Sequence, residues 1–76
     1  MSEPIRKWLF RIEDFEGDKY YLDENGTKGS YDDLPLFVGT YLDASIEGDR
    51  RADLWENENG LVARIVLESQ GIWRVK

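Results

Sequence analysis

The sequence predicts a small all-β domain, built as an antiparallel meander, a sandwich or an SH3-like barrel of five to six strands with one short helix near residues 31–38. Turn-forming residues recur about every 8 to 12 positions, which is typical of such folds. Between the turns, apolar and polar residues alternate, as they do in strands with one buried face. A chain of 76 residues has room for one core, so we expect a single domain over 1–76, with 1–4 as a loose N-terminus.

The first two predicted strands form a hairpin. In the segment 6–15, Trp8, Phe10 and Ile12 alternate with mostly polar neighbours, so these three side chains should share the buried face. The segment 19–22 is rich in β-favouring aromatic residues and should pair antiparallel with the first strand across a short turn.

A turn, a loop and the short helix follow the hairpin. Residues 23–26 end in Asn-Gly, which supplies the positive φ angles of a tight turn, and 27–30 should be loop. Apolar residues then fall at i, i+3, i+4 and i+7 from Leu34, which is helical spacing, and Gly39 is a natural stop. This spacing predicts the helix near 31–38.

The second half of the chain is predicted to form the remaining strands, at 41–46, 51–56, 61–67 and 72–76, with a turn at 69–71 before the last one. The run 61–67 is the most apolar in the chain, and we expect it to lie centrally in the sheet, with Ile65 in the middle of a wholly apolar face. A competing α+β interpretation has a longer helix over 31–47, with Gly48 as its C-cap. Both interpretations keep the strand at 61–67.

The charge of the chain is concentrated in one segment. The net charge is −6, and between Glu13 and Asp33 eight acidic residues stand against only two lysines, so this segment accounts for the whole net charge. Such a field repels phosphate, and direct binding to nucleic acid is not expected. Four arginines that could cluster on neighbouring strands leave an RNA-binding alternative open, and they are Arg6, Arg11, Arg64 and Arg74.

Residue types that most catalytic and metal sites require are missing. Without histidine or cysteine, the common nucleophilic triads and zinc sites cannot form, so we expect no enzyme, no small-molecule substrate, no cofactor and no metal. The acidic turn at 23–26 fails as a calcium loop, because Lys28 stands where glycine is needed. The start of the chain does not have the pattern of a secretory signal and no apolar run could span a membrane, so we expect a cytoplasmic location and no membrane partner.

Acidic turns and two aromatic residues provide the candidate binding surface. The acids of the segment 13–33 sit on turns, where they can converge without disturbing the core. Tyr21 and Trp55 are predicted to point outward, and exposed aromatic residues are enriched at protein interfaces, whereas Trp73 is assigned to the core. The alternative, in which either exposed ring covers a neighbouring strand, stays open. The predicted partner-binding residues are Asp14, Glu16, Asp18, Tyr21, Asp23, Glu24, Asp32, Asp33 and Trp55.

These observations predict a non-enzymatic, acidic protein-binding domain, an inhibitor that docks its acidic face on a basic surface of a partner, such as a nuclease or another nucleic-acid-binding protein. In composition alone, the chain resembles small acidic β-domains among nuclease inhibitors, immunity proteins and phage anti-defence proteins, whose carboxylates take the place of nucleic-acid phosphates. A second hypothesis is an accessory subunit that uses Val62, Val66 and Trp55 as an apolar interface in a larger assembly. The RNA-binding module is the third.

Overall fold

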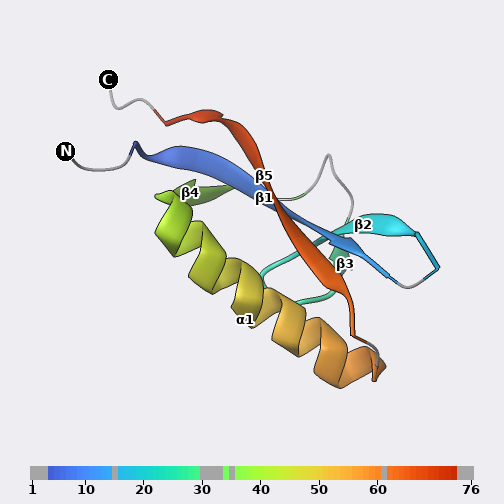
Figure 1. Ribbon diagram of the computed structural model, residues 1–76. Helices are drawn as coiled ribbons and strands as arrows, with labels where there is room; N and C mark the ends of the chain where they lie inside the picture. Colours follow the sequence, from blue (N-terminus) through green and yellow to red (C-terminus); the bar gives the residue numbers. More distant parts are fainter. Residues whose placement is uncertain (1–3, 15, 30–33, 35, 61, 74–76) are drawn as a thin grey trace.

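A curled antiparallel sheet and one long helix make up the part of the chain that the computed structural model describes, residues 4–14, 16–29, 34, 36–60 and 62–73. The helix covers one face of the sheet (Figure 1). In chain order the elements are β1 (Arg6–Glu13), β2 (Lys19–Leu22), β3 (Lys28–Gly29), β4 (Phe37–Gly39), α1 (Tyr41–Asn59) and β5 (Arg64–Ile72). The predicted predominance of antiparallel strands is confirmed, with a helix that is longer and lies later in the chain than expected.

Strand β1 is the centre of the sheet. Along one edge it pairs with β5, and along the other it pairs with β4 through Arg6–Trp8 and with β2 through Arg11–Glu13. The prediction that 61–67 forms the central strand is wrong, because this run leads into β5, whose only neighbour among the described strands is β1 (Figure 1). Its apolar residues are explained by Ile65 and Leu67, which pack against the core.

The first hairpin is confirmed. Strands β1 and β2 pair antiparallel with Ile12 opposite Tyr20, and Gly26 has a φ of 74°, as the predicted turn at 23–26 requires. The prediction of loop over 27–30 is wrong in part, because two of these residues pair with β2 as strand β3.

Helix α1 occupies the place of two predicted strands. The prediction of strands at 41–46 and 51–56 is wrong, because both segments are helical. The prediction of a helix near 31–38 is also wrong at its C-terminal end, which belongs to β4. Most of the other residues of this segment lie outside the described ones. A capping box fixes the start of α1. The Thr40 hydroxyl oxygen accepts a hydrogen bond from the Asp43 N–H at 3.2 Å, and the Asp43 carboxylate accepts one from the Thr40 N–H at 3.1 Å.

Gly48 lies inside the helix and does not end it. The α+β alternative, a helix over 31–47, is right that its last residues are helical and wrong that Gly48 is the C-cap. A Cβ at Gly48 would lie 2.9 Å from Leu67 Cδ2 and 3.3 Å from Phe10 Cδ1, so glycine here lets the helix approach the sheet closely. The helix ends instead at Gly60, with a φ of 69°. In the described part of the chain, no helix is long and apolar enough to cross a membrane.

Strand β5 continues through a predicted turn. Its register against β1 shifts at Gln70, which is an extra residue on this strand, so the predicted turn at 69–71 is a β-bulge within one strand. The predicted last strand at 72–76 contributes Ile72 to β5, and its residues 74–76 lie outside the described part.

Two buried clusters fill the space between the sheet and α1. One holds Trp8, Phe10 and Ala44, and the other holds Ile12, Leu22 and Trp55. The prediction that Trp8, Phe10 and Ile12 share the buried face is confirmed, and Ile65 packs against both clusters. The assignment of Trp73 to the core is wrong, because its side chain is 46% exposed.

Candidate partner-binding site

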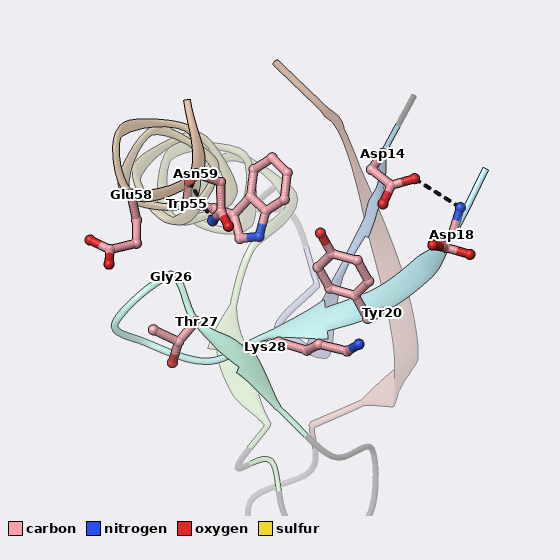
Figure 2. A pocket seen from close by; sticks show the side chains of 9 residues that line it. All are labelled: Asp14, Asp18, Tyr20, Gly26, Thr27, Lys28, Trp55, Glu58 and Asn59. Atoms are coloured by element: carbon pink, nitrogen blue, oxygen red, sulfur yellow. Dashed lines mark hydrogen bonds between the residues drawn. The ribbon is translucent and has the colours of Figure 1, made fainter. Parts of the chain in front are cut away.

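Three segments that are far apart in the sequence converge on one groove of about 380 Å³, which we call the Tyr20 groove (Figure 2). They are the turn between β1 and β2, the turn between β2 and β3, and the last turns of α1. The second turn is held against the helix by Arg50, which donates a hydrogen bond to the Glu24 carbonyl at 2.9 Å. The groove is lined by Asp14, Asp18, Tyr20, Gly26, Thr27, Lys28, Trp55, Glu58 and Asn59.

Trp55 belongs to the core and presents only part of its ring to the groove. It is 5% exposed, so the prediction of an exposed recognition residue is wrong. The reason is that its segment is helical. Trp55 shares a face of α1 with Ala44 and Ala52, and this face packs against Ile12 and Leu22 of the sheet. The apolar interface expected of an accessory subunit therefore loses its aromatic member, although Val62 remains 83% exposed.

Tyr20 forms the other aromatic wall. Its ring centroid lies 6.0 Å from that of Trp55, at an angle of 48° between the ring planes. The Lys28 ammonium nitrogen lies 4.9 Å from the Tyr20 centroid, so a resident cation already occupies one face of this ring. Burial raises the pKa of the Tyr20 hydroxyl, and the negative charges of Asp14 and Asp18 raise it further, while a hydrogen bond with Trp55 opposes them. The groove is thus aromatic and electronegative.

Asp14 and Asp23 hold the two turns together as well as carrying charge. The Asp14 Oδ1 accepts hydrogen bonds from the N–H groups of Glu16 at 3.0 Å and Asp18 at 2.9 Å. Asp23 accepts from two backbone N–H groups, and its Oδ2 accepts from the Thr27 hydroxyl at 2.6 Å. The Thr27 hydroxyl contributes most to lowering the pKa of the Asp23 carboxyl. Short aspartate side chains that accept from their own turn are a recognisable sequence signal, one that the charge count alone does not reveal.

Of the other acids predicted to bind a partner, three are exposed and two lie outside the described residues. Glu16, Asp18 and Glu24 are exposed on the turns that border the Tyr20 groove. Asp32 and Asp33 lie outside the described residues, as does Arg74 of the predicted basic cluster.

Tyr21 lies on the opposite face of β2 from Tyr20. The prediction that Tyr21 points outward is confirmed, because it lies on the sheet face opposite the helix. The prediction that its ring is exposed is wrong, because the ring is half-buried and its hydroxyl donates a hydrogen bond to Glu68 Oε1 of β5 at 2.7 Å, as in the alternative of a ring that covers a neighbouring strand. Consecutive strand residues alternate between faces, and the face of Tyr21 is where Arg11 also lies, 3.1 Å from Glu68 Oε2. Tyr20 faces the helix, packs against the cluster of Ile12, Leu22 and Trp55, and is the tyrosine of the groove.

The end of α1 adds to the groove an acid, Glu58, that lies outside the acidic segment 13–33. Glu56 and Glu58 stand in the last turn, which holds no basic residue, although the negative end of the helix dipole disfavours negative charge there. Glu56 is engaged, because its Oε2 accepts a hydrogen bond from the Ala63 N–H at 3.1 Å. Glu58 is exposed at the groove. We call the set Asp14, Glu16, Asp18, Asp23, Glu24 and Glu58 the acidic face.

The described arginines of the strands do not form a basic patch. Arg6 and Arg11 lie on opposite faces of β1, because their positions differ by five, an odd number. Arg11 shares its face with Arg64 of β5, but Glu13 and Glu68 lie among them, and both pair with Arg11. This arrangement weakens the RNA-binding alternative.

No protein-family model, no curated protein and no solved structure matches this chain. Within the described residues, no group of three or more acidic side chains is placed to hold a metal ion. The chemistry that the groove offers is therefore electrostatic attraction and aromatic contact for a positively charged group.

Proposed function

We propose that the protein is a non-enzymatic binding domain of the cytosol that docks its acidic face on a basic surface of another protein. The observation that carries this proposal is the convergence of acids from two separate segments at one aromatic groove. Asp14 and Asp18 come from the first turn, Glu58 comes from the end of α1, and the second turn supplies the wall between them.

The energetic cost of this arrangement supports a role in binding. Like charges on neighbouring turns repel one another, and Glu58 adds negative charge at the helix end that disfavours it. The hydrogen bonds that Asp14 and Asp23 accept stabilise their own turns, but the repulsion among the acids of the face opposes folding. A partner that brings lysines or arginines relieves the repulsion, and complementary charge also accelerates encounter.

Arginine is the side chain that suits the Tyr20 groove best. A guanidinium group can stack on an aromatic ring while its N–H groups donate to carboxylates. The groove provides both kinds of partner, the rings of Tyr20 and Trp55 and the carboxylates of Asp14 and Asp18. Surfaces rich in arginine and lysine are typical of proteins that bind nucleic acid, so we propose a nuclease or another nucleic-acid-binding protein as the partner, with carboxylates in the place of phosphates.

Affinity capture tests the proposal. The tagged chain is exposed to a lysate of its source organism, and the captured proteins are compared by quantitative mass spectrometry with those of two charge variants. One variant carries Asp18→Lys and Glu24→Lys in the acidic face. The control carries Asp49→Lys and Asp53→Lys, two exposed acids of α1 outside the Tyr20 groove, and has the same net charge.

The expected result is a basic protein that the wild type and the control capture and that the acidic-face variant loses. If the two variants capture the same proteins in equal amounts, the acidic face is not the docking surface and the proposal is wrong.

A further inference from the structure

The outer edge of β5 is open over a regular stretch of strand. Among the described strands β5 pairs only with β1, and its pairing register is uninterrupted from Arg64 to Glu68, before the bulge at Gln70. Exposed strand edges are usually protected by proline, lysine or a bulge, because their free N–H and C=O groups can pair with another chain. The five residues from Arg64 to Glu68 contain no proline, lysine or bulge, and their two charged residues stand at the ends of the stretch, which leaves Ile65, Val66 and Leu67 as an apolar centre.

A groove of about 480 Å³ runs beside this edge, between β5 and α1. Its helix side is formed by Tyr41, Ser45 and Asp49, and its strand side is the stretch 64–67. The groove beside the edge is therefore lined by Tyr41 of the helix and by the apolar strand residues Ile65, Val66 and Leu67.

The sequence of the edge is complementary to itself. If two copies of β5 pair antiparallel about a two-fold axis through Val66, then Arg64 of each copy stands opposite Glu68 of the other, on the same face of the joined sheet. Opposite charges that face one another across antiparallel strands stabilise the pairing, and like charges destabilise it. Centring the axis on Ile65 or Leu67 instead leaves Arg64 opposite an uncharged residue.

We propose that the protein forms a two-fold dimer by antiparallel pairing of the β5 edges, centred on Val66. The second copy covers the edge and the groove beside it, which Tyr41 of α1 lines. Arg64 is exposed and makes no ion pair within the described residues, so its guanidinium group is available to a second copy. The Glu68 carboxylate of that copy already accepts from Tyr21 and pairs with Arg11, and its remaining lone pairs would accept from Arg64. None of the acids of the acidic face lies on β5, and the dimer therefore goes beyond the proposed function.

Disulfide cross-linking tests the register directly, because the natural chain has no cysteine. In a dimer centred on Val66, two copies of Val66→Cys face each other at a separation that a disulfide can bridge. Val62→Cys is the control. It is the more exposed position, but in the same register its two copies lie eight residues apart along the strands, roughly 27 Å, which is far beyond disulfide reach.

The expected result is rapid oxidation of Val66→Cys to a covalent dimer and little cross-linking of Val62→Cys. Equal cross-linking of both variants, or none of either, overturns the proposed register.

Sedimentation velocity of the whole chain, from micromolar to millimolar concentration, tests the charge pairing. The wild type should pass from the 8.9 kDa monomer to twice that mass. Arg64→Glu should raise the dimer dissociation constant at least tenfold, because it faces Glu68 of the second copy in both symmetry-related pairs. Lys19→Glu makes the same change of charge on β2 and should leave the dimer intact. Circular dichroism checks that each variant is folded.

A wild-type chain that stays monomeric at millimolar concentration overturns the proposal, and so does a dimer that Arg64→Glu leaves unchanged. Asp18→Lys with Glu24→Lys should keep the cross-linking pattern at Val66→Cys, so a failure of the dimer is distinguishable from a failure of the acidic face.

Discussion

Arg51 lies across the ring of Phe10, with its guanidinium carbon 4.4 Å from the ring centroid. It is the one buried charged residue among those described, and it is held by Glu47, whose Oε2 accepts a hydrogen bond from Arg51 Nε at 2.7 Å. A buried cation needs a paired charge and hydrogen-bond acceptors. The Glu47–Arg51 pair therefore links the helix to the centre of the sheet.

Acid should weaken the fold through Glu47. The pKa of Glu47 is lowered from 4.5 to about 2. The largest cause is a hydrogen bond from Arg50, and a hydrogen bond from Arg51 lowers the pKa further, while burial opposes both. Because the folded-state pKa is the lower one, this stabilisation is complete above about pH 4.5 and is lost as the pH falls toward 2. It amounts to about 1–2 kcal/mol, allowing for the exposure of Arg50.

Urea unfolding at a series of pH values measures this effect. The wild type should lose that stability between neutral and acid pH, and Glu47→Gln should be less stable at neutral pH and less sensitive to acid. Asp53→Asn, an exposed acid on the same helix, should behave as the wild type does. A Glu47→Gln variant with the wild-type pH dependence would show that other carboxyls cause the loss.

Gly26 should be the turn glycine least tolerant of substitution. Both Gly26 and Gly17 have positive φ angles, of 74° and 87°, so an alanine at either costs about 1–2 kcal/mol of backbone strain. A Cβ at Gly26 would also lie 2.5 Å from Leu54 Cβ and 2.9 Å from the Arg51 carbonyl oxygen, whereas one at Gly17 meets nothing within 4 Å. Gly26→Ala should therefore lower the free energy of unfolding by about 1–3 kcal/mol more than Gly17→Ala does. Equal losses in chemical denaturation would mean that the 23–26 turn does not pack on the helix.

Trp55→Ala should damage folding. The ring fills the cluster with Ile12 and Leu22, and truncating a buried tryptophan costs about 3–5 kcal/mol. Val62→Ala, at a highly exposed position, should change stability by less than about 0.5 kcal/mol. Thermal melts followed by circular dichroism compare the two. If Trp55→Ala has the same melting temperature as the wild type, the Trp55 ring is exposed and does not belong to the core.

The residues on the two faces of α1 explain why the sequence did not predict this helix. Its buried stripe holds the small residues Ala44, Gly48 and Ala52 together with the charged Arg51, so that Trp55 is its one large apolar residue and the apolar periodicity is weak. Leu42 and Ile46 are exposed, and together with Ala44 they imitate the alternation of a strand. A small-residue stripe is needed because α1 lies close to the sheet, and that closeness is a tertiary property that no local pattern reports.

The hairpin of β1 and β2 could be predicted because its signals are local: alternation in each strand and a glycine turn between them. The acidic turns were found for the same reason. The Tyr20 groove could not be predicted, because its walls come from β2 and from a helix end that the sequence assigned to a strand. Once the helix is known, the approach of Trp55 and Glu58 to the first hairpin follows.

The acidic face should control the rate at which the captured partner associates. Complementary charge raises association rates more than it lowers dissociation rates, so the wild-type on-rate should fall steeply from low to physiological salt while the off-rate changes less. Asp18→Lys with Glu24→Lys should slow association at least roughly tenfold at low salt. Stopped-flow or surface-based kinetics measure both rates.

The control pair Asp49→Lys and Asp53→Lys has the same net charge, so it separates local attraction from the general field of the chain. If both pairs slow association equally, only the total charge matters; if neither does, the acids of the turns serve solubility alone.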